Sequence, residues 1–131
     1  MCETILTKYG FTRTNYRQIC AMRPCIRTLS LQRVRRNTET LEKYLPHTEI
    51  KRQICRYPKL LEADIEAWTT FLEFYGVSQK DIRNLYLNSY AFLTETNIYD
   101  FGMRILNVKS YGFTDEEIRR FYIPLFTKKT A

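Results

Sequence analysis

The sequence predicts an all-α protein built from stacked helical repeats. A phrase of Tyr, Gly, an apolar residue and Ser or Thr occurs at Tyr9, Tyr75 and Tyr111, with a degenerate copy at Tyr44. Prolines follow at matching distances, since Pro24 and Pro58 are 34 residues apart and Tyr90, where a proline would be expected, lies 32 residues further on. A fixed period in this range is typical of an array in which each repeat covers its neighbour's apolar face. No segment competes seriously as a β-strand.

The chain of 131 residues fits one domain, and 44% hydrophobic and 15% aromatic residues suffice for a core. We expect a single repeat domain over 1–131, with repeats at about 1–44, 45–75 and 76–111 and a partial repeat at 112–131. No apolar run approaches the roughly eighteen residues of a spanning helix, so membrane insertion is not expected. No secretory signal is recognised.

The N-terminal half is expected to contain four helices. A helix tail ends at Gly10, and Thr12 caps a helix over about 13–22 that Pro24 stops. A helix over about 28–44 buries one stripe, and Pro46 or Thr48 opens a short helix that ends at Tyr57. The residues of the buried stripe are Leu31, Val34, Leu41 and Leu45, with Thr38 between them.

The C-terminal half continues the pattern with a long helix over 60–75 and a short helix over 79–89 that starts with a Ser78–Asp81 capping pair. Residues 94–97 form a cap region before a helix over about 96–110. Thr114 and Glu117 form a capping box for a last helix. Apolar spacing predicts the inward residues of these helices as Leu61, Ile65, Trp68, Leu72, Tyr75, Ile82, Leu85, Tyr86, Ile98, Phe101, Ile105, Val108, Ile118, Phe121 and Tyr122, with Pro124 ending the last helix.

The charge is distributed unevenly along the chain. The formal net charge is +7, but residues 1–60 carry thirteen Lys/Arg against four Asp/Glu, and residues 61–131 carry eight against ten. This asymmetry predicts that the N-terminal half holds a polyanion and leaves the acidic C-terminal half for solvent or a protein partner. The candidate nucleic-acid-binding residues are Arg13, Arg17, Arg23, Arg27, Arg33, Arg35, Arg36, Lys51, Arg52, Arg56 and Lys59.

The arginine-rich stretch from 13 to 36 has three readings. It is nearly free of acids, as mitochondrial targeting segments are. It also keeps the repeat register, which favours a folded surface that contacts RNA or DNA, and a solvated basic face without a ligand is the third reading. Tyr16, Tyr57 and Tyr99 could stack on unpaired bases, although packing within the repeat is favoured for them.

No catalytic, metal or cofactor site is predicted. The four cysteines have the spacing of neither a secreted disulfide scaffold nor a zinc ribbon, so reduced thiols are expected over two disulfides or a metal site. Cys20 and Cys55 end the same Arg-Gln-Ile-Cys phrase and are expected at equivalent small core positions. His47 has no partner at a recognised catalytic spacing and fits a cap or the surface. Glu62, Asp64 and Glu66 are expected on a solvated face.

The alternation of short and long helices, the sequence Pro58-Lys-Leu-Leu61 and the Tyr-Gly phrase together resemble the mitochondrial transcription termination factor family over nearly the whole chain. This resemblance implies a superhelical solenoid of helix pairs, right- or left-handed, in an organellar protein that binds DNA or RNA through basic residues. By matching position, Arg13, Arg17, Arg52 and Arg56 lie on the short helices. Tyr90 replaces an expected proline, and the family's members usually have more repeats.

We therefore expect a non-enzymatic protein of the mitochondrial matrix that binds structured RNA as a component or associated factor of the mitochondrial ribosome, with rRNA favoured over duplex DNA. One alternative is a duplex-DNA-binding factor that ends or regulates transcription. The other is a protein–protein adaptor in a mitochondrial assembly, which would dock its partner on the acidic C-terminal half.

Overall fold

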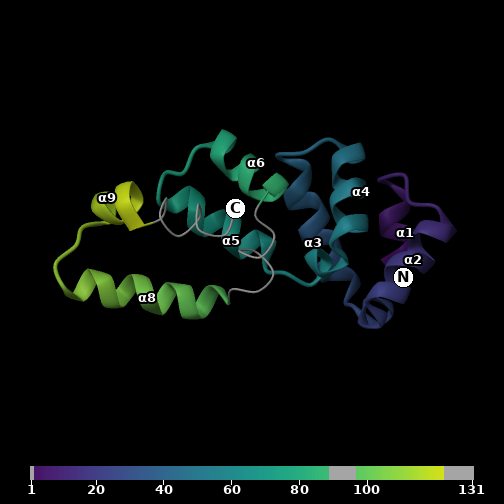
Figure 1. Ribbon diagram of the computed structural model, residues 1–131, viewed down its shortest axis with the longest axis horizontal. Helices are drawn as coiled ribbons and strands as arrows, with labels where there is room; N and C mark the ends of the chain where they lie inside the picture. Colours follow the sequence, from purple (N-terminus) through teal and green to yellow (C-terminus); the bar gives the residue numbers. More distant parts are fainter. Residues whose placement is uncertain (1, 89–96, 123–131) are drawn as a thin grey trace. The chain divides into compact units, whose positions relative to one another are not determined.

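The computed structural model describes residues 2–88 and 97–122, and within these ranges every regular element is a helix (Figure 1). The prediction of an all-α fold is therefore confirmed. The internal contacts divide the chain into two compact units, Met1–Glu66 and Ala67–Ala131, which we call the first and the second unit.

The first unit contains α1 (Cys2–Thr7), α2 (Arg13–Met22), the 3₁₀ turn η1 (Pro24–Thr28), α3 (Leu31–Glu42), α4 (His47–Arg56) and the 3₁₀ turn η2 (Pro58–Leu61). Helix α3 packs against α1, α4 and η2, and α2 packs against α4. This arrangement encloses one apolar core. Its fully buried residues include Leu6, Ile19, Ile26, Val34, Leu41, Ile50, Ile54, Leu60 and Leu61.

The second unit contains most of α5 (Ile65–Phe74), followed by α6 (Gln79–Asn88), α8 (Ile98–Ser110), α9 (Asp115–Glu117) and the π-helical turn η3 (Ile118–Tyr122). Its core is aromatic. The ring of Phe101 lies 5.3 Å from the rings of both Trp68 and Phe71, measured between centroids. Beside this cluster the buried hydroxyls of Thr69 and Tyr86 form a hydrogen bond.

The three short helices α2, α4 and α6 follow one pattern. Each contains ten residues and buries its fourth, seventh and eighth positions. These positions lie on one side of a helix, because residues three and four apart share a face. The buried sets are Tyr16, Ile19 and Cys20 in α2, Ile50, Gln53 and Ile54 in α4, and Ile82, Leu85 and Tyr86 in α6.

The turns that precede α2, α6 and α9 share their geometry, whereas α4 follows Pro46 and has no side-chain cap. Gly10, Gly76 and Gly112 have φ values of 89°, 74° and 94°, in the left-handed region where a glycine ends a helix at the least cost. Two residues later a hydroxyl caps the next helix. Thr12, Ser78 and Thr114 accept hydrogen bonds from the backbone N–H three residues on, at 3.1, 3.2 and 3.2 Å.

The predicted helices are found with a few differences. The helix expected over 60–75 begins only at Ile65, because Pro58 starts the separate turn η2. Leu31 was expected inside but is 43% exposed. The buried side of α3 centres on Val34, Asn37 and Leu41, which lies about 90° around the helix from Leu31. Ile98 and Val108 are only half-buried.

The prediction that Cys20 and Cys55 are equivalent is wrong. The two helices align with an offset of 34 residues, from Arg13–Met22 to His47–Arg56, whereas their Arg-Gln-Ile-Cys phrases lie 35 residues apart. The residue equivalent to the buried Cys20 is therefore the buried Ile54, and Cys55 falls at a half-buried position.

At the C-terminal end the Thr114–Glu117 capping box is confirmed. Asn97 caps α8 by accepting a hydrogen bond from the N–H of Tyr99 at 2.7 Å. The predictions for residues 94–96, Tyr90, Pro124 and the side chains of Phe121 and Tyr122 lie outside the residues that the structure describes.

Candidate nucleic-acid interface

The candidate basic residues all lie in the first unit, on five of its elements. This unit contains thirteen Lys/Arg and seven Asp/Glu, a formal net charge of +6. Arg13 and Arg17 lie on α2 with Arg23 at its C-terminal cap, Arg27 lies on η1, Arg33, Arg35 and Arg36 lie on α3, Lys51, Arg52 and Arg56 lie on α4, and Lys59 lies on η2.

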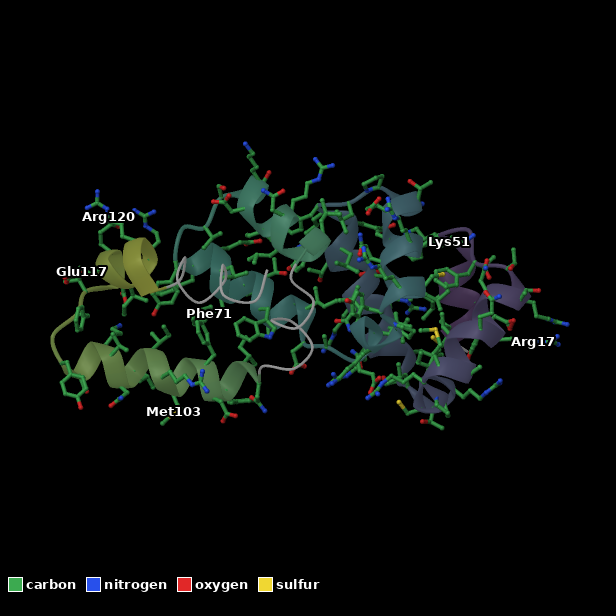
Figure 2. All side chains as sticks on the ribbon, viewed as in Figure 1. Arg17, Lys51, Phe71, Met103, Glu117 and Arg120 are labelled. Atoms are coloured by element: carbon green, nitrogen blue, oxygen red, sulfur yellow. The ribbon has the colours of Figure 1, made fainter. Side chains whose placement is uncertain are left out.

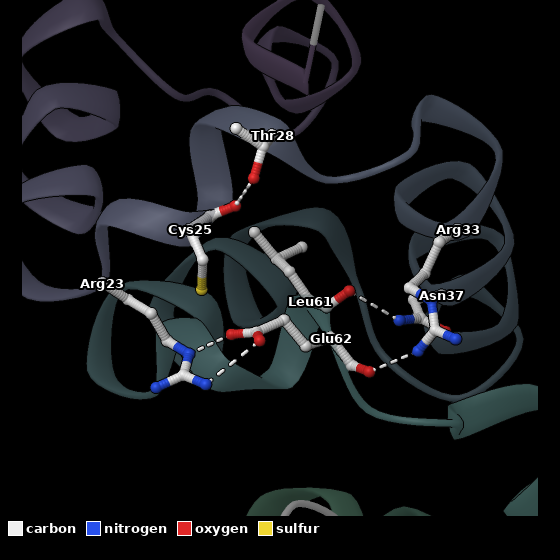
Figure 3. Close-up of polar contacts among 7 residues, drawn as sticks. All are labelled: Arg23, Cys25, Thr28, Arg33, Asn37, Leu61 and Glu62. Atoms are coloured by element: carbon white, nitrogen blue, oxygen red, sulfur yellow. Dashed lines mark hydrogen bonds and ion pairs between the residues drawn. The ribbon is translucent and has the colours of Figure 1, made fainter.

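Two of these arginines take part in a junction between η1, α3 and the end of η2 (Figure 3). The Arg23 guanidinium forms a two-pronged ion pair with the Glu62 carboxylate. Arg33 donates to the Glu62 backbone carbonyl and lies 3.4 Å from an Asp64 carboxylate oxygen. The Asn37 amide, which is buried, donates to the carbonyls of Leu61 and Ala63 at 2.9 Å each.

This junction satisfies the carbonyl groups that η2 leaves without helical partners at its end. The hydrogen bond from Arg23 lowers the pKa of Glu62 below its ordinary value and raises that of Arg23 above its own, although partial burial opposes both shifts. Glu62, expected on a solvated face, is half-buried and ion-paired instead. Arg23 and Arg33 are thus already engaged in contacts within the first unit.

Arg13 and Arg52 make weaker contacts. Each forms a long ion pair with an N···O distance of 3.9 Å, Arg13 with Glu3 and Arg52 with Glu49. Their side chains remain 77% and 70% exposed. Exposed pairs of this length contribute little to stability, so both guanidinium groups are available to a phosphate.

The other seven candidates make no ion pair among the residues that the structure describes. They are Arg17, Arg27, Arg35, Arg36, Lys51, Arg56 and Lys59, exposed except for the half-buried Lys51 and Lys59. Arg56 lies 5.8 Å from the centroid of the Tyr57 ring. A polyanion would supply the negative charge that the described carboxylates do not bring within ion-pair distance of these seven cations.

One basic position recurs in the short helices, and sequence reasoning did not identify it. The fifth residue is Arg17 in α2, Lys51 in α4 and Arg83 in α6, and counting five residues from the start of α9 reaches Arg119 in η3. Figure 2 shows Arg17 and Lys51 on the neighbouring helices α2 and α4. We call these four residues the fifth-position cations. Counting from each cap, rather than searching for charge clusters, would have found Arg83 and Arg119.

Two fifth-position cations cover the glycine of an earlier Tyr-Gly turn. A Cβ on Gly10 would lie 3.8 Å from Cδ of Lys51, and a Cβ on Gly76 would lie 3.0 Å from Cδ of Arg119. The methylene groups of Lys51 and Arg119 therefore lie close to the backbone of Gly10 and Gly76. Packing of the stem restricts the side chain while its charged end stays near solvent.

The aromatic candidates separate by exposure. Tyr16 is buried, and this burial, with a hydrogen bond to Cys20, raises its pKa to about 12. A base cannot stack on it in this fold. Tyr57 and Tyr99 are exposed, so the structure leaves the stacking prediction open for both.

The remaining polar groups do not form a catalytic constellation. All four cysteines are free thiols, and burial raises the pKa of Cys2 to about 11, which suppresses the reactive thiolate. His47 is exposed at the first position of α4 and lies 2.8 Å from Glu42, which also pairs with Lys8.

The described residues contain no group of three His, Cys, Asp or Glu side chains placed to hold a metal ion. Within the same ranges, none of the helices combines the length and the apolar character needed to cross a membrane.

Comparisons with known proteins found no match: no protein-family model, no curated protein and no solved structure is similar to this chain.

Proposed function

We propose that the protein binds structured RNA through the basic surface of its first unit and is not an enzyme. The observation that carries this proposal is a set of seven cations that form no ion pair with the residues the structure describes. They remain after the ion-paired Arg13, Arg23, Arg33 and Arg52 are set aside. Arginine's planar fork matches phosphate oxygens, and phosphate contacts supply most non-specific affinity.

The repeated local geometry supports a second part of the proposal, that the chain is a solenoid of helix pairs similar to those of mitochondrial transcription termination factors. The short helices α2, α4 and α6 share their length and their buried positions, and the fifth residue is basic in each. On this reading the protein works in the mitochondrial matrix, and ribosomal RNA in a mitochondrial ribosome is its ligand.

Salt-dependent binding tests the proposal. If about six phosphates are engaged, affinity for a folded rRNA fragment falls by about three orders of magnitude between low and moderate salt. The variant Arg17→Gln/Lys51→Gln removes two fifth-position cations and should weaken binding and reduce the salt slope. The matched control Lys43→Gln/Lys80→Gln removes the same charge from exposed sites outside the candidate set and should bind nearly as wild type. Binding that is absent at low salt, or insensitive to salt, contradicts the proposal.

A duplex-DNA-binding factor for transcription is the first alternative, because the same cations suit either backbone. Competition between a folded rRNA fragment and DNA duplexes for the purified protein decides between them. Preference for a duplex of particular sequence would favour the transcription role.

The adaptor alternative rests on the exposed acidic residues of α5. Glu66 and Glu73 lie on its surface, whereas Glu62 belongs to the junction with Arg23. Glu66→Ala/Glu73→Ala should then abolish co-purification of a mitochondrial partner while RNA binding persists.

A further inference from the structure

Two of the Tyr-Gly turns are covered by a short helix that comes later in the chain. In the first unit, the methylene groups of Lys51 lie close to the backbone of Gly10. The ring of His47 lies 4.9 Å from the ring of Tyr9, measured between centroids, and Tyr9 is buried. His47 and Lys51 are the first and the fifth residues of α4.

The second unit repeats this contact at the turn of Tyr75 and Gly76. The methylene groups of Arg119 lie close to the Gly76 backbone. Burial of Tyr75 and the neighbouring Asp115 carboxylate raise the pKa of that tyrosine. Asp115 and Arg119 are the first and the fifth residues counted from the start of α9. We call this arrangement, in which the first and fifth residues of a short helix cover the tyrosine and the glycine of an earlier turn, the turn contact.

The third turn, at Tyr111 and Gly112, is not covered by the residues that the structure describes. Tyr111 is 77% exposed and Phe113 is 49% exposed, whereas the matching residues of the first turn are buried. A Cβ on Gly112 would meet nothing within 4 Å. The Glu117 carboxylate also lies at this turn, because its Oε1 accepts a hydrogen bond from the Thr114 N–H at 3.0 Å. It forms no ion pair within the described ranges.

The first and fifth residues of α2 are likewise uncovered. They are Arg13 and Arg17, and in α4 the same two positions cover the first turn. The Arg13 side chain is 77% exposed, and Figure 2 shows Arg17 directed away from α4. A guanidinium group stacks on a tyrosine ring, and arginine methylene groups can lie on a glycine as those of Arg119 do. The two surfaces are also opposite in charge, because α2 offers two guanidinium groups to the Glu117 carboxylate.

We propose that copies of the chain associate head to tail, with α2 of one copy forming a turn contact on the third turn of the next copy. Arg13 stacks on the Tyr111 ring of the neighbouring copy. The methylene groups of Arg17 lie on its Gly112, and the Arg17 guanidinium pairs with its Glu117. The contact joins two different surfaces, so each copy keeps one surface for a further copy and association continues beyond a dimer.

Sedimentation velocity of the full chain tests the proposal. One turn contact is smaller than a standard stable interface, so association is weak and needs high concentration. Up to several hundred micromolar, the weight-average sedimentation coefficient should rise steadily past that of a dimer. Because Arg13 and Arg17 also belong to the candidate nucleic-acid interface, nucleic acid is left out, and the result does not depend on the proposed RNA binding. A wild type that stays monomeric, or that stops at a dimer, overturns the proposal.

Two variants each remove one side of the contact. Arg13→Glu/Arg17→Glu reverses the charge on α2, and Tyr111→Ala removes the exposed ring of the third turn. Each variant alone should raise the dissociation constant at least about tenfold. An equimolar mixture keeps one intact pair of surfaces, so it should form a one-to-one complex and nothing larger. The proposal is overturned if either variant associates as wild type does, or if the mixture forms no complex.

Matched controls place the same changes elsewhere. Arg35→Glu/Arg36→Glu reverses two exposed arginines on α3, and Tyr99→Ala removes an exposed tyrosine on α8. Both should associate as wild type does, and circular dichroism melting verifies the fold of every variant. A control that weakens association as much as the variants of the turn contact also overturns the proposal, because another surface would then join the copies.

Discussion

At the scale of single residues, Asn37 is the polar side chain whose loss should matter most in the first unit. Its amide donates to the carbonyls of Leu61 and Ala63, and it is only 4% exposed. Asn37→Ala leaves both carbonyls without their donor and should lower the free energy of unfolding by about 2–4 kcal/mol, measured by urea denaturation. Asn84→Ala on the exposed side of α6 is the control and should change stability little. Equal effects would show that the junction is not a structural element.

The ion pair between Arg23 and Glu62 should make stability depend on pH. Because Arg23 lowers the pKa of Glu62 below its ordinary 4.5, the pair's contribution is complete above that value and is lost as pH falls through the lower folded pKa. The stability difference between wild type and Glu62→Gln should therefore be largest near neutral pH and shrink below pH about 4.5. Glu66→Gln, at an exposed position, should not show this dependence. A constant difference between Glu62→Gln and wild type across that range would contradict the assignment.

At the scale of elements, the Tyr-Gly turns allow a matched comparison. Gly76 and Gly112 both have positive φ, so alanine at either should cost about 1–2 kcal/mol. A Cβ at Gly76 would also press on Arg119 at 3.0 Å, whereas Gly112 has open space. Gly76→Ala should therefore be the more destabilising in thermal unfolding, and adding Arg119→Ala should remove the excess. If the two glycine variants lose equal stability, the Arg119 stem does not lie on Gly76 in solution.

Sequence reasoning recovered the short helices because their signals are local. For α2 and α6, a glycine with positive φ, a hydroxyl cap two residues later and apolar residues at helical spacing all lie within one stretch of chain, and for α4 the apolar spacing follows Pro46 directly. The junction could not be predicted, because Arg23 and Glu62 are 39 residues apart and only the packing of η1, α3 and η2 brings them together. For the same reason Arg23 and Arg33 were placed with the free cations.

At the scale of the whole molecule, the repeat proposal predicts that the two units unfold together. In an array each repeat is stabilised by its neighbours. Ile54→Ala creates a cavity in the first unit, while Trp68, the only tryptophan, lies in the second. We expect Ile54→Ala to shift the Trp68 fluorescence transition to lower urea by as much as the far-UV circular dichroism transition. An unchanged fluorescence midpoint would show that the units are independent and that the chain is not one array.

The one-residue displacement of the Arg-Gln-Ile-Cys phrase bears on how such a chain can change length. One extra residue before the phrase turns its side chains by about 100° around α4. Ile and Cys are adjacent in the phrase, and both suit a core. Ile54 therefore takes the buried position in α4 that Cys20 has in α2, and α4 keeps an apolar residue there. The glutamine of the phrase suits the new position less well. Gln53 is buried in α4, and its side-chain Oε1 has no hydrogen-bond partner. The same four-residue phrase thus folds in two registers, and the shifted one turns a glutamine side chain toward the core.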